Sequence, residues 1–172
     1  TLHTVLAEPD AAQRDVMERI VDASARVVVM AEKARDLLRT VYRLPADKIE
    51  VIAHGIPEFA FVEPDEAKER LGFGDKSVIL TFGLLSPNKG IETMIDALPD
   101  LAKAHPDLVY VVLGATHPHL VAREGEAYRE KLQAQAVALG VAGHLMFVNE
   151  YVDAPILQDW LSAADIYVTP YL

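Results

Sequence analysis

The residues best placed to do chemistry lie in a loop between an apolar run and a helix-like segment. Gly83 ends the run VILTF, and Lys89-Gly90 precede apolar residues at helical spacing. Such a strand-to-helix junction binds phosphate in parallel sheets, because the first N–H groups of a helix lack partners and its dipole favours an anion. Lys89 adds a positive charge, and the two glycines allow the backbone to approach a ligand closely. The loop therefore predicts a site for a phosphorylated ligand, although an ordinary turn with a solvated lysine fits the local sequence equally well.

Polar residues also follow other strand-like runs. His3 and His54 each follow one, and Glu150-Tyr151 follow the run LMFV. Ligands of open α/β sheets lie beyond the carboxyl ends of the strands, so His3 could act in catalysis and Glu150 could accept hydrogen bonds from a ribose or a base. The alternatives are structural: a histidine that packs locally, a turn at His54, and an acidic residue near the start of the next helix.

Two histidines, His117 and His119, lie near the acidic residues Glu124 and Glu126. This composition raises the possibility of a metal site. The spacing of the histidines is a weak signal, however, and no motif places a third ligand. No metal is expected here, and the loop at Lys89 matches neither the P-loop nor the dinucleotide-binding pattern.

The elements that must position these residues alternate along the chain. Strands are expected over residues 1–6, 26–30, 49–53, 77–82, 108–113, 145–148 and 165–169. Helices are expected over residues 9–23, 32–43, 65–71, 91–104, 126–139 and 153–163, with a loop over 114–123. Short apolar strands that alternate with helices indicate parallel sheets covered on both faces. The glycine- and proline-containing stretch 56–76 is the expected linker between a first part, residues 1–55, and a second part, residues 77–172.

Composition excludes several classes of protein. The chain has 172 residues, 51% of them hydrophobic and 24% charged, and a net charge of −10, which argues against disorder and against a nucleic-acid-binding protein. The absence of cysteine excludes disulfides and cysteine nucleophiles and fits a cytoplasmic protein. No apolar run approaches the roughly 20 residues of a membrane-spanning helix. The chain begins with Thr1 and ends just after a predicted strand, so we expect a fragment of a longer protein.

The order of these features resembles the retaining glycosyltransferases of family 4, which have the GT-B fold. The matching segments are residues 1–4, 25–30, 48–56, 82–92, 111–114 and 161–170, or TLHT, ARVVVM, KIEVIAHGI, FGLLSPNKGIE, VVLG and LSAADIYVTP. Each segment alone is a weak signal, whereas their combination in this order is specific. The resemblance covers nearly the whole chain.

The resemblance implies an α/β fold of two Rossmann-like lobes that face each other across a cleft. Residues 1–55 would be the remnant of the first lobe, and residues 77–172 part of the second, which binds a nucleotide-diphosphate sugar. By motif match, His3 corresponds to the active-site histidine, Lys89 to the lysine on the donor diphosphate, and Glu150-Tyr151 to the region near the base. The expected substrate-binding residues are Gly83, Lys89, Gly90, Gly114, Glu150 and Tyr151. The activity implied is glycosyl transfer with retention to an unknown acceptor, with no metal or other cofactor.

Two departures from the family pattern qualify these expectations. Leu84 stands where an arginine usually provides a second cation for the diphosphate, and the family's acidic E-x7-E motif would lie beyond Pro170. The 172-residue chain is therefore expected to be inactive alone, and exposed strand edges are expected to promote self-association. The alternative function is a non-catalytic module that binds a nucleotide or a phosphosugar.

Overall fold

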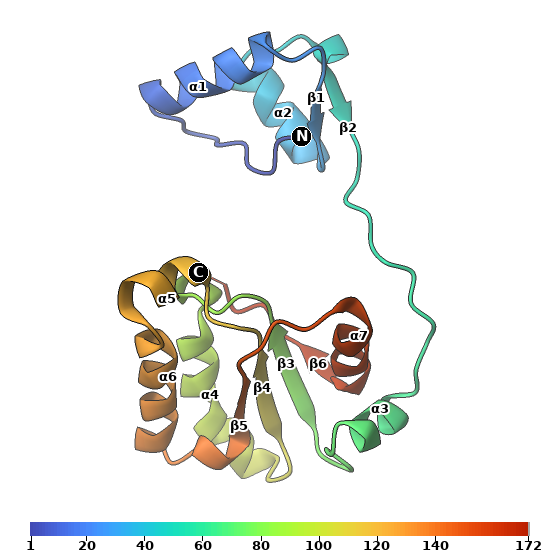
Figure 1. The fold of residues 1–172 in the computed structure, drawn as a ribbon, viewed down its shortest axis with the longest axis vertical. Helices are drawn as coiled ribbons and strands as arrows, with labels where there is room; N and C mark the ends of the chain where they lie inside the picture. Colours follow the sequence, from blue (N-terminus) through green and yellow to red (C-terminus); the bar gives the residue numbers. More distant parts are fainter. Residues whose placement is uncertain (172) are drawn as a thin grey trace. The chain divides into compact units, whose positions relative to one another are not determined.

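The computed structural model describes residues 1–171 and consists of two compact units, Thr1–Glu58 and Phe59–Leu172. Figure 1 shows the fold of each unit. The helix expected within residues 56–76 is present as α3 (Pro64–Arg70) and belongs to the second unit. Within the described residues, no helix is both long and apolar enough to cross a membrane.

The first unit has a small parallel sheet packed against helices. Its elements are α1 (Ala11–Asp22), β1 (Val27–Val29), α2 (Glu32–Thr40), a 3-10 turn (Ala46–Lys48) and β2 (Ile49–Val51). Strand β1 pairs in parallel with β2, and Val27 lies opposite Ile49. The strand expected over residues 1–6 is wrong: Leu2 alone pairs, through a single bridge to Val29. A segment that forms only one bridge lacks the ladder of backbone hydrogen bonds that makes a strand.

Local residues set the start of α1 and the end of α2 in the first unit. The Asp10 carboxylate accepts a hydrogen bond from the Gln13 N–H, and the Gln13 side chain accepts one from the Asp10 N–H, which is a capping box at the start of α1. Helix α2 ends at Thr40, earlier than the expected residue 43. The chain reverses instead at Arg43, whose φ is 57°, and the Leu44 N–H donates to the carbonyl of Leu38. A left-handed residue thus ends the helix before Pro45 can.

The second unit alternates strands and helices as expected. Its elements are α3, β3 (Val78–Phe82), a 3-10 turn (Pro87–Lys89), α4 (Ile91–Ala104), β4 (Val109–Leu113), α5 (Pro118–Glu124), α6 (Ala127–Ala138), a 3-10 turn (Ala142–His144), β5 (Leu145–Val148), α7 (Ala154–Ala163) and β6 (Ile166–Tyr167). The loop expected over residues 114–123 is wrong in part, because Pro118 occupies the first turn of the short helix α5. Gly140 ends α6 at a φ of 71°, in agreement with the sequence.

The four-stranded sheet of the second unit is parallel throughout, with the order β5-β4-β3-β6. Along the chain the first three strands run from β3 outward to β5, and the fourth returns to the other side of β3. This reversal is the strand order of nucleotide-binding α/β halves. Ligands of such sheets bind beyond the carboxyl ends of the strands near the reversal, which here are the ends of β3 and β6.

Alternate residues of the strands contact different layers. Ile79, Tyr110 and Val112 pack in the cluster that contains α4 and α6, whereas Val78 and Leu80 pack in the cluster that contains Trp160 of α7. Figure 1 shows α4 and α6 on one side of the sheet and α3 and α7 on the other. Because both faces are covered, the strands are apolar runs, and the sheet is a rigid support for the loops at its edge.

An ion pair joins α3 to the start of β6. The Lys68 ammonium lies 2.8 Å from one carboxylate oxygen of Asp165, and the other oxygen accepts a 2.7 Å hydrogen bond from the Val78 N–H. The Lys68 side chain is 10% exposed and that of Asp165 is 42% exposed. Burial alone would raise the pKa of Asp165, but the hydrogen bonds from Lys68 and Val78 outweigh it and lower that pKa.

We expect the change Asp165→Asn to destabilise the second unit at pH 7 by about 1–3 kcal/mol, because it removes a charge-assisted contact to a buried lysine. A carboxyl group with a lowered pKa in the folded state contributes stability above its unfolded pKa of about 4, and this contribution is lost as pH falls through the folded pKa. Urea unfolding followed by Trp160 fluorescence at pH 7 and near pH 3 should show the difference shrink in acid. The exposed control Asp100→Asn should change little, and an acid-independent loss for Asp165→Asn would contradict the ion-pair explanation.

Candidate functional site

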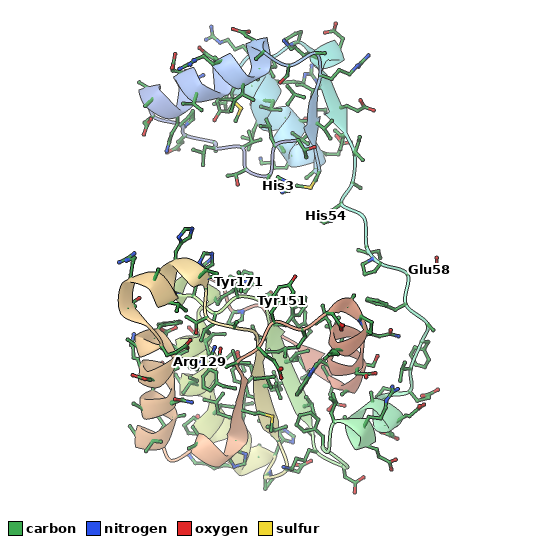
Figure 2. All side chains as sticks on the ribbon, viewed as in Figure 1. His3, His54, Glu58, Arg129, Tyr151 and Tyr171 are labelled. Atoms are coloured by element: carbon green, nitrogen blue, oxygen red, sulfur yellow. The ribbon has the colours of Figure 1, made fainter. Side chains whose placement is uncertain are left out.

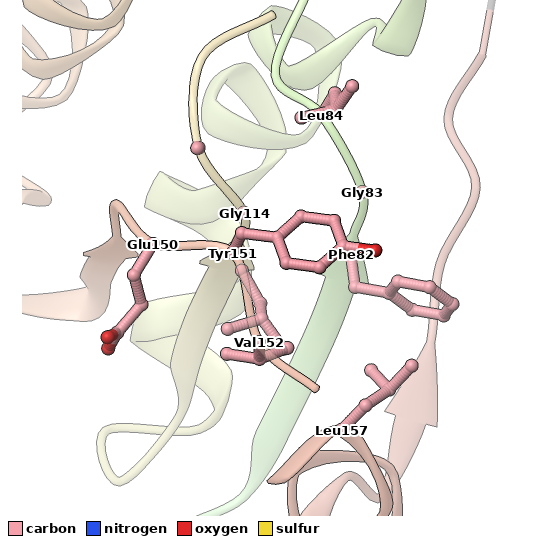
Figure 3. A pocket seen from close by; sticks show the side chains of 10 residues that line it. Phe82, Gly83, Leu84, Gly114, Glu150, Tyr151, Val152 and Leu157 are labelled. Atoms are coloured by element: carbon pink, nitrogen blue, oxygen red, sulfur yellow. The ribbon is translucent and has the colours of Figure 1, made fainter. Parts of the chain in front are cut away.

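The main candidate site is a pocket of about 280 Å³ at the carboxyl edge of the second unit's sheet (Figure 3). It is formed where β3, β4 and β5 end and where α7 begins. Its lining residues are Phe82, Gly83, Leu84, Leu113, Gly114, Ala115, Glu150, Tyr151, Val152 and Leu157. Four of the expected substrate-binding residues, Gly83, Gly114, Glu150 and Tyr151, thus line one pocket.

Two of these glycines allow the loops after β3 and β4 to touch. Gly83 has a φ of 122° and Gly114 a φ of 141°, both unfavourable for a side chain. A Cβ atom on Gly114 would lie 2.2 Å from the carbonyl oxygen of Gly83. The Gly83 N–H also donates a 2.9 Å hydrogen bond to the Leu113 carbonyl. The floor of the pocket is therefore bare backbone, which a ligand can approach closely.

Lys89 lies above this floor on the loop that leads into α4. A Cβ atom on Gly83 would be 3.3 Å from the Lys89 ammonium nitrogen, so the absence of a side chain at Gly83 leaves room for the ammonium group. The ammonium donates a 2.6 Å hydrogen bond to the Tyr171 hydroxyl and lies 4.1 Å from the centre of that ring. Within residues 1–171, Lys89 forms no ion pair with a carboxylate. Its charge is thus available to an anionic ligand.

Gly90 completes the loop. Its φ of 62° places it in the left-handed region between the 3-10 turn and α4, and no side chain caps the first turn of α4. The Lys89 ammonium is therefore close in sequence to the backbone N–H groups at the start of this 14-residue helix, and both attract an anion. The sequence predicted the order of strand, turn and helix here, but not the 3-10 turn or the left-handed conformation of Gly90. That this loop binds phosphate stays a prediction.

The remaining walls of the pocket suit a flat, partly apolar group. Tyr151 is 86% exposed, and in Figure 3 its ring extends toward Phe82, whereas the Glu150 side chain extends in a different direction. Val152 and Leu157 complete an apolar surface below the two rings. An exposed aromatic face beside apolar side chains can stack on a planar ring such as a nucleobase. Leu84, at the position of the family's arginine, provides an apolar side chain and no charge.

A buried arginine joins the loops that form the pocket. Arg129 of α6 is 5% exposed, and its Nη2 donates to the carbonyl of Gly114 at 3.1 Å and to the side-chain oxygen of Asn149 at 2.6 Å. The same nitrogen lies 3.0 Å from the Thr116 hydroxyl, and Nε donates to the Glu126 carboxylate at 3.0 Å. One guanidinium group thus holds the loop after β4 against the loop after β5.

Glu126 is the charge partner of this arginine. A 2.6 Å hydrogen bond from the Thr116 hydroxyl is the main cause that lowers the pKa of Glu126; burial opposes the shift, and Arg129 reinforces it. From the sequence, Glu126 was considered only as a possible metal ligand, and Arg129 was not identified. One signal was available: Arg129 lies next to Tyr128 and three residues before Leu132, on the buried side of α6. A charged residue within an apolar helix face indicates a buried polar network.

The other candidate residues lie elsewhere. His3 belongs to the first unit, and Figure 2 shows it with His54 at the end of that unit where β1 and β2 finish. His3 is exposed. His117 and His119 stack, with ring centres 5.3 Å apart. Within residues 1–171, no group of three His, Asp or Glu side chains is arranged to hold a metal ion.

The sequence of this chain is similar to the sequences of two glycosyltransferases. The chain is 30% identical over 164 residues to a D-inositol 3-phosphate glycosyltransferase of Jonesia denitrificans, a match that covers 89% of this chain and 37% of the relative. It is 34% identical over 125 residues to the lipopolysaccharide core biosynthesis mannosyltransferase LpsB of Rhizobium meliloti, which covers 70% of this chain and 33% of the relative. The chain thus spans less than two fifths of the length of either relative.

A solved structure shares the fold. Anabaena HepE, crystallised in complex with UDP, superposes with a TM-score of 0.73 at 18% identity, over 93% of this chain and 42% of HepE. The sequence family described as glycosyl transferases group 1 matches residues 63–172, which is more than half of the chain and includes every residue of the pocket. The expected α/β fold of GT-B type is confirmed, and the chain belongs to the glycosyl transferases of group 1.

Proposed function

We propose that the second unit binds the donor, a nucleotide-diphosphate sugar, and that the complete protein transfers the sugar to an acceptor with retention of configuration. The observation that carries this proposal is the pocket at the carboxyl edge of the parallel sheet, with the Lys89 ammonium beside Gly83 of its floor. Bare backbone at Gly83 and Gly114, an ammonium group that pairs with no carboxylate of the described residues, and an exposed aromatic ring are the features that a diphosphate and a base require. The UDP bound by HepE, which has the same fold, adds support.

Each group has a role in the proposed reaction. Lys89 and the first N–H groups of α4 bind the diphosphate and stabilise the negative charge that develops on it when the sugar departs, and preorganised charges of this kind are a large source of catalysis. Tyr151 stacks on the base, and Glu150 accepts hydrogen bonds from the ribose. His3 acts on the acceptor side. Cationic side chains and backbone donors provide this stabilisation without a metal ion.

The named relatives include an inositol phosphate glycosyltransferase and a mannosyltransferase of lipopolysaccharide synthesis, so their acceptors differ. Self-association of the chain also stays a prediction. Light scattering of the purified chain checks it, and the mass of a compact monomer would contradict it.

The change Lys89→Ala tests donor binding. It removes one charge-assisted contact, worth about 1.5–3 kcal/mol, so we expect UDP or GDP to bind roughly 10- to 100-fold more weakly. Isothermal titration calorimetry should show unchanged affinities for uridine and guanosine, because in the proposed complex the base lies at the other end of the pocket. Lys103→Ala, in the last turn of α4, is the matched control. Equal loss of nucleoside and nucleotide binding would contradict the assigned role.

Binding is the appropriate measurement for this chain, and the expectation that it is inactive alone stays a prediction. Incubation with a nucleotide sugar and candidate acceptors, with Lys89→Ala as the blank, checks this expectation. Transfer above the blank would contradict it and would also exclude the alternative of a non-catalytic binding module. The configuration of any product, measured by NMR, would decide whether transfer proceeds with retention.

A further inference from the structure

A second hollow adjoins the pocket and shares one wall with it. It has a volume of about 540 Å³ and is lined by Leu84, Ser86, Asn88, Lys89, His117, His119 and Leu120. Leu84 lines both cavities, so the hollow lies directly beside the floor of the proposed donor site. Neither Ser86, Asn88 nor the two histidines has a role in the proposed function.

Backbone contacts fix the loop that carries the histidines beside the loop that carries Lys89. Leu85 and Thr116 form a parallel bridge. The Leu85 N–H donates to the Ala115 carbonyl and the His117 N–H donates to the Leu85 carbonyl, both at 2.9 Å. Leu85 is also 1% exposed, which anchors this crossing in the core. The histidines are therefore held by the fold beside the Lys89 loop.

The hydrogen bonds of the two imidazoles determine which atoms can bind a ligand. Nδ1 of His117 accepts a 3.2 Å hydrogen bond from the backbone N–H of His119, so a neutral ring carries its proton on Nε2, which is a donor. The His119 ring stacks on it at an interplanar angle of 23°, and its side chain is exposed. Both rings therefore have N–H groups available beside the Lys89 ammonium.

The chemistry of the lining favours an anionic ligand. The polar groups are an ammonium, a carboxamide, a hydroxyl that donates to the oxygen of that carboxamide, and two imidazoles, and no carboxylate is among the described residues that line the hollow. In a chain with a net charge of −10, a surface hollow lined by donors and one cation differs from the average surface. A phosphoryl group, with several acceptor oxygens, matches such a set of donors.

We infer that His117 and His119 bind a phosphoryl group next to Lys89 and supply the donors that Leu84 does not. This inference rests on the proposed function and adds to it which residues replace the arginine of the family pattern. The phosphoryl group belongs either to the donor diphosphate or to a phosphorylated acceptor. A donor diphosphate and an acceptor phosphate would present the same phosphoryl oxygens to this hollow, and titration with one ligand of each kind distinguishes them.

The test is the change His119→Ala, because His119 is exposed and its side chain accepts no hydrogen bond from the residues that the structure describes. In calorimetric titrations of the 172-residue chain, we expect UDP and GDP to bind roughly 5- to 10-fold more weakly and uridine to bind unchanged. His119→Gln, which retains an N–H donor, should restore part of the affinity. His105→Ala, an exposed histidine that precedes β4 at the opposite edge of the sheet, is the matched control.

A second titration identifies the source of the phosphoryl group. If the hollow binds an acceptor phosphate, His119→Ala should weaken the binding of glycerol 3-phosphate to the chain saturated with UDP. If the hollow binds the donor diphosphate, His119→Ala should weaken the binding of UDP. His117→Asn retains a helix-capping side chain and should weaken the same ligand. NMR spectra of the histidine rings should show His119 shifted by that ligand in the unsubstituted chain.

The inference is overturned if His119→Ala and His117→Asn leave the affinities for UDP, GDP and glycerol 3-phosphate unchanged. Lys89→Ala separates this failure from a failure of the proposed function. If Lys89→Ala weakens UDP while the histidine variants do not, the proposed function stands and the inference alone fails. If UDP and GDP do not bind the unsubstituted chain, both fail.

Discussion

Replacement of Gly114 by alanine is expected to destabilise the second unit by at least about 3 kcal/mol, or to prevent its folding. The new Cβ atom would lie 2.2 Å from the carbonyl oxygen of Gly83, far inside van der Waals contact, and the φ of 141° is itself strained for alanine. Neither neighbour can move easily, because the Gly83 N–H is bonded to Leu113 and the Gly114 N–H to Val148. Urea unfolding followed by the fluorescence of Trp160, the only tryptophan, measures the effect within this unit.

Gly140→Ala is the matched control for this prediction. Gly140 also has a positive φ, 71°, but a Cβ atom there would meet no heavy atom within 4 Å. Its expected cost is the strain of a left-handed alanine alone, about 1–2 kcal/mol. Variants that unfold at the same urea concentration would show that the contact between Gly83 and Gly114 adds nothing. A Gly114→Ala chain that folds should also bind UDP more weakly, because the floor of the pocket would have moved.

The sequence predicted the second unit better than the first, and the reason is physical. In the second unit the strands are short apolar runs, and local signals mark helix ends, as at Asp153, which caps the start of α7, and at Gly140, which follows α6, so local signals and the final fold agree. In the first unit, residues 1–6 resemble a strand, but only Leu2 finds a pairing partner. Strand formation depends on a neighbour, which local sequence does not reveal.

The candidate site divides in the same way. The sequence indicated Gly83, Lys89 and Gly90 as candidates, because a strand-to-helix junction with a cation is a local pattern. It did not identify the contact between Gly83 and Gly114, which joins loops 31 residues apart. Nor did it identify Arg129, whose partners come from α6 and from the loops after two strands. A network of this kind exists only when the tertiary structure assembles it.

Replacement of Arg129 by methionine is the other change for which we expect a large effect, about 2–4 kcal/mol of lost stability in the second unit, less than for a fully buried ion pair because the Glu126 side chain is 37% exposed. Methionine fills much of the same volume but leaves the Glu126 carboxylate without its cation, and Asn149 and the Gly114 carbonyl without their donor. Uncompensated polar groups of this kind account for most of the cost. Trp160 fluorescence in urea measures it, and Arg123→Met, an exposed arginine of α5, should change stability by less than about 0.5 kcal/mol.

The change Arg129→Lys separates charge from geometry at this position. Lysine keeps the charge beside Glu126 but offers a compact ammonium group instead of a planar fork, so it cannot reach Glu126, Asn149 and Gly114 together. We therefore expect it to recover part of the stability, while the affinity for UDP stays below that of the unsubstituted chain, because the loops after β4 and β5 are no longer held together. Full recovery of both stability and affinity by lysine would show that Arg129 contributes charge alone and does not position the pocket.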